Sequence, residues 1–390
     1  MRRRTLLGAS LGVLAAHAGG AGARAPASLG CLGPAVWSAF VARHVQADGR
    51  VVDFDTPRQH ATSEGQGYAL FLALVHNQPL LFERLLRWTE DNLAGGSLAR
   101  QLPAWQWGRR DDGTWGVVDP NAASDADLWI AYALLEAGRL WRRSEYTERG
   151  VQLLALVERE EVMDLPGLGP MLLPWPRSAA SGPAWRLNPS YLPMPLLRRM
   201  AQLDPAGPWP GIAQATVRMV AAVAPQGFAP DWCAWSQTGQ GFVQDPGKAP
   251  VGGYDAIRVY LWAGLGPPGD AAQAALLETL AGPRRALEQA AAGMPERVDV
   301  LSGKGDGTAP LGFGGALLPY LRAQQLTALF DAQLARIRER LNAPEAAALP
   351  YYERMLLLFG LAHVEGHCAF DAQGRLQPRW SALCPSSRPA

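Results

Sequence analysis

The chain has 390 residues, of which 48% are hydrophobic and 18% are charged, and its formal net charge at pH 7 is +1. This length and apolar content are sufficient for a large globular core, and the near-zero charge excludes the basic surface that nucleic-acid binding requires. Tryptophan is unusually common, with 14 residues against 9 tyrosines and 10 phenylalanines. Because indole rings are difficult to bury completely, this excess predicts exposed aromatic surfaces for stacking.

The N-terminal segment has the composition of an export signal. Three arginines at 2–4 form a basic start, an apolar stretch at 6–18 follows, and small residues at 21–23 offer a cleavage site. The last two arginines and the apolar residues after them resemble a twin-arginine signal. The apolar stretch is too short to span a membrane. We therefore expect a signal peptide over residues 1–25, no membrane span in the mature chain, and a periplasmic or secreted location.

The chain contains four cysteines, Cys31, Cys233, Cys368 and Cys384. Export permits disulfides, and four cysteines allow three pairings. Cys31 and Cys384 lie near the two ends of the mature chain, which often meet at a protein surface. Our hypothesis is a Cys31–Cys384 bond between the termini, whereas Cys233 stands in an apolar run that predicts burial.

Apolar residues recur with helical spacing along the mature chain, and no alternating stretch is long enough to build a major sheet. Long segments rich in Gly, Pro and Trp separate helix pairs, and short strands are expected within them, such as 227–232 with 241–243. This pattern predicts an all-α fold, a closed ring of helical hairpins with long loops on one side. No low-complexity linker divides residues 26–390, so we expect one catalytic domain. The expected helices cover residues 33–46, 64–76, 79–93, 126–143, 146–161, 190–202, 210–224, 255–264, 270–280, 284–292, 313–322, 325–341 and 345–363.

Glu64, Asp125 and Asp255 share one local setting, in which small residues precede an acid and an apolar helix follows. Each setting is also that of an ordinary helix cap, which stabilises a helix by about 1 kcal/mol. The expected caps are Thr62 or Ser63 for the first helix, the residue at 124 or 125 for the second, and Asp255 for the third. In a ring of hairpins, however, helix starts that share a direction open on one face, so the three carboxylates are expected to converge on one cleft.

Three convergent carboxylates with nearby tryptophans and no basic patch suit a neutral, ring-shaped ligand rich in hydroxyls, which describes a glycan. Cleavage of a glycosidic bond needs one protonated carboxyl group and one carboxylate. A metal site is not expected: His363 and His367 have i, i+4 spacing, but glutamate does not directly follow the first histidine as it does in zinc peptidases.

The segment Ala-Ser-Asp-Ala-Asp at 123–127 is similar to the signature of glycoside hydrolase family 8, and the segments at 62–66 and 254–262 are similar to its two other characteristic blocks. The resemblance covers essentially the whole mature chain, and it looks closest to the periplasmic endoglucanases encoded beside bacterial cellulose synthases. It continues through residues 103–108, 166–169 and 188–193.

This resemblance implies an (α/α)6 barrel with a groove across the face that bears the N-termini of the inner helices. It implies an endo-acting, inverting hydrolase of β-1,4-glucan that needs no cofactor. By the same resemblance Glu64 is the general acid, Asp255 is the general base, and Asp125 holds the distorted sugar. We expect a monomer, with a cellulose synthase export complex as the protein partner that the resemblance suggests.

Further candidates are assigned to substrate binding. By the resemblance, Tyr254 and Arg258 stand beside the base and Tyr191 lines the groove, and one turn along its helix Arg258 would favour an ionised Asp255. Repulsion from an Asp125 carboxylate and desolvation by sugar would keep Glu64 protonated. Inversion requires the two catalytic carboxyl groups to lie about 6.5–9.5 Å apart. The remaining candidates are Asp127 of the signature and the sugar-stacking tryptophans Trp105, Trp107, Trp129 and Trp185.

Two alternatives remain open at this stage. In the first, the same fold acts on xylan, chitosan or mixed-linkage glucan, although chitosan favours additional carboxylates in the groove and the sequence has no clear surplus. Alternatively, the chain is a glycan-binding subunit of an export complex that has lost catalysis. The presence of all three acids argues against this second alternative.

Overall fold

The computed structural model describes residues 32–179, 184–236, 238–239, 241–290 and 293–380. The predicted signal peptide lies outside the described residues, and so does the disulfide predicted between Cys31 and Cys384. Cys233 and Cys368 lie inside them, and both are buried free thiols. In the part of the chain that is described, every helix is too short or too polar to span a bilayer.

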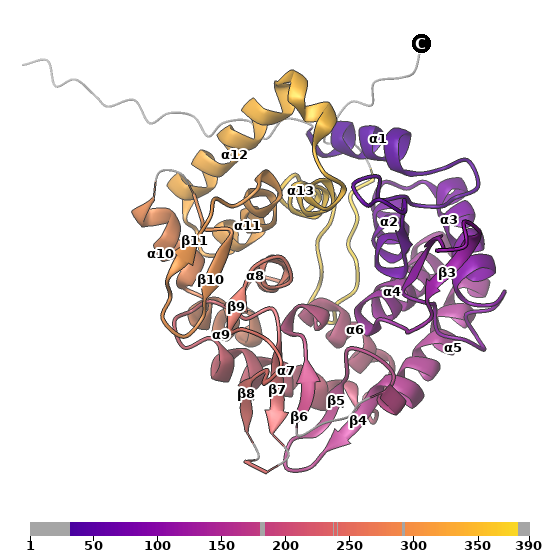
Figure 1. Cartoon of the computed structure of the whole chain (residues 1–390), viewed down its shortest axis with the longest axis horizontal. Coiled ribbons are helices and arrows are strands. Elements are labelled where there is room, and N and C mark those ends of the chain that lie inside the picture. The colour runs from indigo at the N-terminus through magenta and orange to yellow at the C-terminus, as the bar shows by residue number, and fades with distance from the viewer. Residues whose placement is uncertain (1–31, 180–183, 237, 240, 291–292, 381–390) are drawn as a thin grey trace, which may run out of the picture.

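Six inner helices, most of whose residues are buried, form a closed ring around the centre of Figure 1. Each one contacts the next, and the last contacts the first. Apart from α6, which has a polar side, their surfaces are mostly apolar, which is typical of helices enclosed by other helices. The inner helices are α2 (Ser63–Val75), α4 (Ser124–Trp141), α6 (Met194–Leu203), α8 (Ala256–Gly264), α11 (Leu311–Ala323) and α13 (Tyr351–Val364).

An outer layer of helices surrounds this ring, and along the chain each inner helix is preceded by an outer one. The alternation produces six helical hairpins, so the predicted (α/α)6 barrel is confirmed. The outer helices are α1 (Leu32–His44), α3 (Pro79–Leu93), α5 (Ser144–Glu161), α7 (Trp209–Val223), α9 (Ala271–Thr279) with the short α10 (Gly282–Gln289), and α12 (Thr327–Asn342).

Four small antiparallel sheets are built from the long loops. The strand expected at 227–232 starts only at Cys233, because Gly227 has a positive φ of 72° and a turn precedes the strand. The sheets are β1 (Ala61–Thr62) with β2 (Gln106–Arg109) and β3 (Trp115–Asp119), β4 (Val162–Leu165) with β5 (Gly169–Leu172), β6 (Ala184–Leu187) with β7 (Cys233–Ser236) and β8 (Phe242–Gln244), and β9 (Val251–Gly252) with β10 (Arg297–Asp299) and β11 (Gly305–Asp306).

Proline sets two helix boundaries that periodicity alone misplaced. The helix expected at 345–363 is a 3₁₀ turn, Pro344–Ala348, followed by α13, because Pro350 stands at the break. The helix expected at 190–202 begins at Met194, because Pro193 occupies its cap position. The residues before it form a separate 3₁₀ turn, Pro189–Tyr191.

The C-terminal segment after α13 closes the barrel at the end opposite the N-termini of the inner helices. On α4, Tyr132 donates a hydrogen bond to the carbonyl of Gly374 at 2.8 Å, and Glu136 accepts one from the N–H of Leu376 at 2.9 Å. Glu136 lies three helical turns beyond Asp125, roughly 16 Å along the helix. The opening of the barrel is therefore at the end where the inner helices begin.

Aromatic side chains from four inner helices fill the barrel interior. Trp129 is 1% exposed, and its ring centroid lies 4.8 Å from that of Phe71, 5.3 Å from Trp262 and 5.2 Å from Phe359. The prediction that Trp129 stacks on sugar is therefore wrong. Its position on α4 directs the ring to the barrel axis, where it packs in the core.

Candidate active site

The N-terminus of α2 presents Glu64. The Thr62 hydroxyl accepts a hydrogen bond from the N–H of Gly65 at 3.0 Å, which confirms the predicted cap and leaves Glu64 free in the first turn. The Glu64 side chain is 25% exposed. The hydroxyl of Tyr351, at the start of α13, lies so close to the backbone here that a Cβ at Gly65 would collide with it.

The N-terminus of α4 presents Asp125 in a different environment. The helix begins at Ser124 after Ala123 and has no side-chain cap, so the predicted capping by Ser124 or Asp125 is wrong. The Asp125 side chain is only 2% exposed. It therefore points into the barrel, deeper than Glu64.

The N-terminus of α8 presents Asp255. This residue has helical backbone angles and its side chain makes no capping bond, so the prediction that Asp255 caps the helix is wrong. The cap comes instead from Asp231, in the loop between α7 and β7, whose Oδ1 accepts hydrogen bonds from three backbone N–H groups. The Asp255 side chain stays 30% exposed.

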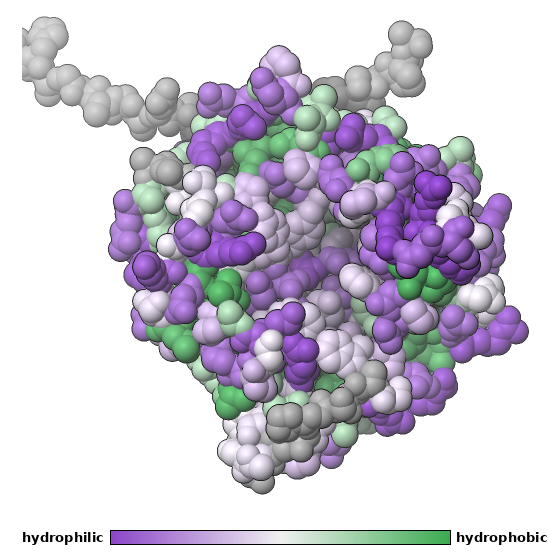
Figure 2. Space-filling view, in the orientation of Figure 1, coloured by the Kyte–Doolittle hydropathy of each residue, from purple (hydrophilic) through white to green (hydrophobic). Residues whose placement is uncertain are grey.

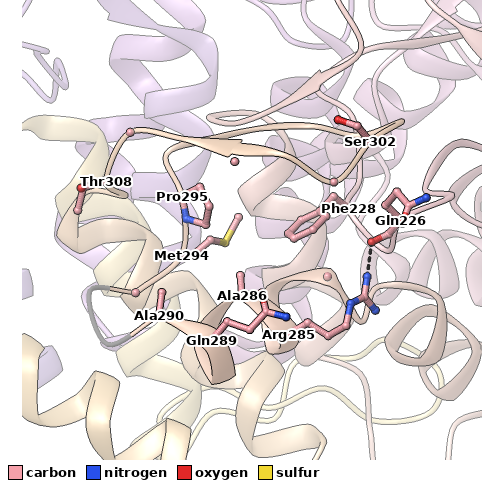
Figure 3. A pocket seen from close by; sticks show the side chains of 15 residues that line it. Gln226, Phe228, Arg285, Ala286, Gln289, Ala290, Met294, Pro295, Ser302 and Thr308 are labelled. Carbon is pink, nitrogen blue, oxygen red and sulfur yellow. Dashed lines mark hydrogen bonds between the residues drawn. The ribbon is translucent and has the colours of Figure 1, made fainter.

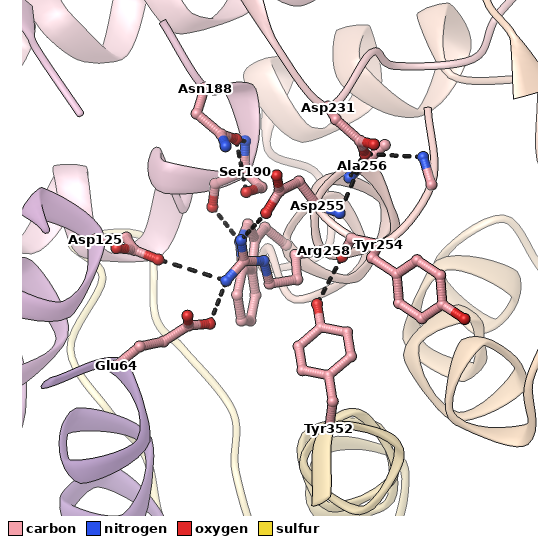
Figure 4. A network of polar contacts seen from close by, with 12 residues as sticks. Glu64, Asp125, Asn188, Ser190, Asp231, Tyr254, Asp255, Ala256, Arg258 and Tyr352 are labelled. Carbon is pink, nitrogen blue, oxygen red and sulfur yellow. Dashed lines mark hydrogen bonds and ion pairs between the residues drawn. The ribbon is translucent and has the colours of Figure 1, made fainter. Parts of the chain in front are cut away.

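The three acids meet around the guanidinium group of Arg258 (Figure 4). Nη1 of Arg258 donates to Oε1 of Glu64 and lies 3.4 Å from Oδ2 of Asp125, while Nη2 donates to Oδ1 of Asp255 at 2.6 Å. The structure thus brings together acids from three helices that are distant in sequence. Arg258 itself is buried, so the guanidinium lies beneath two carboxyl groups that reach solvent.

Asp125 lies in a different electrostatic environment from the two exposed acids. Burial, reinforced by the nearby charge of Glu64 and opposed by Arg258, raises the pKa of Asp125 to about 8. The charges of Asp125 and Glu64 thus repel each other, and this repulsion favours a proton on Asp125 at neutral pH.

Asp127 lies away from the opening. It is fully buried beside Glu161, the last residue of α5, and burial raises the pKa of both carboxyl groups. A proton shared by the two side chains accounts for their burial without a cation. The prediction that Asp127 contacts substrate is therefore wrong, because no ligand in the groove can reach it.

Trp105 and Trp107 lie on the loop that pairs with β1, directly before Glu64. The carbonyl of Trp105 accepts a hydrogen bond from Ser63 N–H at 2.9 Å, and the Trp105 side chain is 40% exposed. Trp107 is half-buried, and its ring stacks on that of Trp115 with centroids 5.5 Å apart. Arg50 lies over both of these rings. Trp105 therefore offers the freer face for stacking.

A second aromatic group surrounds Tyr191, which was predicted to line the groove. The Tyr191 ring lies 5.8 Å from the Arg258 guanidinium carbon and 6.1 Å from the ring of Trp232, which in turn lies 5.8 Å from Trp175. The predicted stacking residue Trp185 is partly buried against the hydrophobic core, and its role in stacking stays a prediction. Trp232 lies beside Tyr191, and Trp175 lies beside Trp232.

Tyr254 stands beside Asp255 and is 42% exposed. Its hydroxyl donates to Oε1 of Glu296 at 2.9 Å, and its carbonyl accepts a hydrogen bond from the hydroxyl of Tyr352 at 2.6 Å. Tyr254 is thus held at both ends, with its ring at the edge of the site (Figure 4).

On the face that carries the N-termini of the inner helices, the surface has a central hollow, and the residues visible in this hollow are mostly hydrophilic (Figure 2). A separate pocket of about 470 Å³ lies between α10 and the β10–β11 hairpin, with Phe228 and Arg285 in its wall (Figure 3), and none of the three acids lines it. Within the described ranges, no three His, Cys, Asp or Glu side chains are placed to hold a metal ion. The central hollow is therefore the candidate site.

Several residues of the site were not selected from the sequence. Tyr68 follows Glu64 by one helical turn, and its hydroxyl accepts a hydrogen bond from Nη1 of Arg258 at 3.1 Å, so the i, i+4 spacing was a usable signal. Three further residues come from segments that are distant in sequence, and nothing in their local sequence indicates the site. They are Asp231, Tyr351 and Tyr352.

Acids at the N-termini of inner helices, around an open hollow in an (α/α)6 barrel, are typical of polysaccharide-cleaving enzymes, which need a pair of carboxyl groups. The family model of glycosyl hydrolases family 8 matches residues 12–366, and the chain belongs to this family. An endoglucanase of Xanthomonas axonopodis pv. citri (strain 306) is 51% identical over 97% of each chain, and one of Salmonella typhi is 42% identical over 93% of this chain and 95% of its own. The crystal structure of an endo-1,4-D-glucanase from Vibrio fischeri ES114 superposes with a TM-score of 0.82, at 40% identity, over 89% of this chain and 99% of that one.

Proposed function

We propose that this protein is an exported endo-1,4-β-glucanase that hydrolyses cellulose chains with inversion at the anomeric carbon. The observation that carries the proposal is the pair of partly exposed carboxyl groups, Glu64 and Asp255, arranged over one buried guanidinium. Because both groups reach solvent while their shared partner is buried, a sugar chain in the hollow can meet both of them.

Glu64 is proposed as the general acid and Asp255 as the general base. Asp255 accepts a hydrogen bond from Nη2 of Arg258, which orients its carboxyl group, and as the base it takes a proton from water. Inversion requires room for a water beside Asp255, and thus a separation of about 6.5–9.5 Å between the two carboxyl groups, whereas direct nucleophilic attack on the sugar would favour a closer pair, about 5–5.5 Å apart.

The proton that Glu64 delivers is proposed to come from the acid pair that it forms with Asp125. The pKa of Asp125, raised to about 8, keeps one proton in this pair at neutral pH. A sugar that covers Glu64 removes water from it and disfavours its charge, so the proton is proposed to move toward Glu64 as the site fills. Asp125 is then proposed to accept a hydrogen bond from a hydroxyl of the distorted sugar.

The proposal of β-1,4-glucan as substrate rests on the relatives, which are named endoglucanases at 42% and 51% identity over nearly the whole chain. Exposed rings at Trp105 and Tyr254 and the half-exposed ring of Trp232 support a chain of neutral sugar rings. Xylan and mixed-linkage glucan offer similar rings, so they are the substrates against which cellulose must be compared.

Export to the periplasm is proposed from the basic and apolar N-terminal segment. A role in bacterial cellulose synthesis, next to a synthase export complex, is proposed from the resemblance to periplasmic endoglucanases encoded beside cellulose synthases. Cell fractionation and N-terminal sequencing of the mature protein test the location. Deletion of the gene, followed by measurement of secreted cellulose, tests the link to synthesis.

A polysaccharide panel tests the activity itself. The purified protein is incubated with carboxymethylcellulose, mixed-linkage glucan, xylan and chitosan, and the reducing ends and viscosity are followed. The proposal expects the fastest release from carboxymethylcellulose, with an early fall in viscosity that marks internal cleavage. Faster release from xylan or chitosan would reassign the substrate, and no release from any of them would favour the glycan-binding alternative.

A further inference from the structure

The cap of helix α8 comes from outside the helix. Oδ1 of Asp231 accepts hydrogen bonds from the N–H groups of Gly253 at 2.8 Å, Asp255 at 3.1 Å and Ala256 at 2.8 Å. One carboxylate oxygen thus binds the first helical N–H, that of Ala256, together with the N–H of the cap residue Asp255 and the N–H of Gly253 in the turn before it. A cap supplied by a residue more than twenty positions earlier in the chain is unlike the local caps of α2 and α9.

Asp231 is itself fixed against α8 and β9. Its N–H donates to the carbonyl of Val251 at 2.8 Å, two residues before the segment that it caps. The N–H of Ala229 donates to the hydroxyl of Tyr260, a buried residue of α8, at 3.0 Å. The loop that carries Asp231 and the helix that carries Asp255 are therefore tied at two further points.

This arrangement decides where the Asp255 side chain points. An acid at the position before a helix normally turns back to accept a hydrogen bond from the second or third N–H of that helix. Here the N–H of Ile257 donates to the carbonyl of Gly253 at 3.0 Å and the N–H of Arg258 donates to the carbonyl of Asp255 at 3.1 Å. Asp231 fixes the backbone N–H of Asp255 and those on either side of it, so the Asp255 side chain starts from an anchored backbone, reaches Nη2 of Arg258 and remains 30% exposed in the hollow. Without Asp231, the backbone around Asp255 would lose three hydrogen bonds and the carboxylate would lose its fixed position.

We propose that Asp231 is a positioning residue, which caps α8 in place of Asp255 and thereby holds the Asp255 carboxylate toward the substrate. The inference rests on the proposed function only for the role of Asp255 as the base. It requires the acceptor oxygen of Asp231 at its present place, and it does not require the charge of Asp231.

Two variants of Asp231 distinguish the position of its acceptor oxygen from the charge of its carboxylate. Asp231→Asn keeps an acceptor oxygen at the same distance from the backbone and removes the charge. Asp231→Glu keeps the charge and moves the oxygens outward by one methylene. Asp270→Glu is the matched control, because Oδ1 of Asp270 caps α9 through the N–H of Gln273 at 2.7 Å, on the outer layer of the barrel. For each variant, kcat and KM on a soluble cello-oligosaccharide are measured together with the melting temperature.

We expect Asp231→Asn to retain kcat within about threefold of the wild type. We expect Asp231→Glu to lower kcat at least tenfold with KM within about twofold, and Asp270→Glu to leave both constants within about twofold. A displaced catalytic group lowers kcat in this way without weakening substrate binding. If Asp231→Glu does not fold, Asp231→Ser, which cannot reach all three N–H groups, takes its place with the same expectation.

Either of two results overturns the inference: Asp231→Glu as active as the wild type, or Asp231→Asn as impaired as Asp231→Glu, which would mean that the carboxylate charge itself is required. Asp255→Asn is measured beside them. An active Asp255→Asn variant refutes the role of Asp255 in the proposed function, whereas an inactive Asp255→Asn with a fully active Asp231→Glu refutes only the positioning role.

Discussion

Glu64 and Asp255 accept hydrogen bonds from the two terminal nitrogens of a single guanidinium group, that of Arg258. The two residues come from the first turns of α2 and α8, on different hairpins of the barrel. A planar guanidinium holds two carboxylates at a fixed spacing that a more flexible cation does not impose. The shared guanidinium group therefore sets the relative position of the two carboxyl groups in the site.

Replacement of either proposed catalytic carboxyl group should abolish turnover and preserve the fold. Glu64→Gln and Asp255→Asn are each expected to lower kcat by about 10²–10⁴, the usual contribution of general acid–base catalysis. Both side chains are partly exposed, so the melting temperature should change little. Steady-state kinetics and circular dichroism check this prediction, and near-normal hydrolysis by either variant would refute the assignment of that residue.

The Arg258→Lys variant keeps the positive charge but loses the planar guanidinium group with its two terminal nitrogens. A lysine ammonium cannot hold Glu64 and Asp255 at their present spacing, so kcat should fall by about 100-fold, the usual effect of a displacement near 1 Å. The control is Arg149→Lys, at an ion pair of 3.1 Å with Glu90 between outer helices, which should leave kcat unchanged. Equal kcat values for the two variants would show that the charge alone is sufficient.

Asp125→Asn should change how the stability of the protein depends on pH. Burial and the charge of Glu64 raise the pKa of Asp125 to about 8 in the folded protein, against about 3.9 for an unfolded chain. The folded state therefore binds more protons between about pH 4 and pH 8, so stability falls as pH rises through this window. Asparagine is neutral throughout, so the variant should lose less stability between pH 5 and pH 9.

Urea denaturation midpoints at pH 5 and pH 9 measure this difference for the wild type and for Asp125→Asn. The charge of Asp125 also raises the pKa of the buried carboxyl groups Asp127 and Glu161, so its removal reduces their contribution to the pH dependence and acts in the same direction. An equal or steeper loss of stability in the variant would mean that Asp125 is already ionised at neutral pH.

Trp105 and Trp129 were both predicted from the sequence to stack on sugar, but their replacement by alanine should have different effects on stability and KM. Trp105→Ala removes an exposed ring, so stability should hardly change and KM should rise about fivefold, which corresponds to roughly 1 kcal/mol of stacking. Trp129→Ala opens a cavity in the core and should cost about 3–5 kcal/mol of unfolding free energy. Thermal unfolding and kinetics on cello-oligosaccharides distinguish the two, and an unchanged KM for Trp105→Ala would exclude stacking on that ring.

The sequence predicted the helical barrel and the three acids because both have local signals. Helical periodicity and proline positions mark the hairpins, and the same loop–acid–helix pattern recurs at Glu64, Asp125 and Asp255. All three acids do begin inner helices on one face. The boundary errors at 193 and 350 arose where proline overrides periodicity.

Other features depend on tertiary placement and have no local signal. Trp129 and Trp105 were both predicted to stack on sugar, yet one ring is buried in the barrel core and the other is 40% exposed. The protonation of Asp125 results from its depth in the barrel, and the cap of α8 depends on Asp231, which folds back from a separate loop. Such properties are determined only when distant segments meet.

The most direct test of the central claim is the anomeric form of the first product. Cellopentaose is hydrolysed in an NMR tube, and the anomeric proton signals are followed before mutarotation equilibrates them. If Glu64 and Asp255 act as acid and base on opposite sides of the cleaved bond, the new reducing end appears first as the α-anomer. Initial appearance of the β-anomer would show retention and would contradict the account.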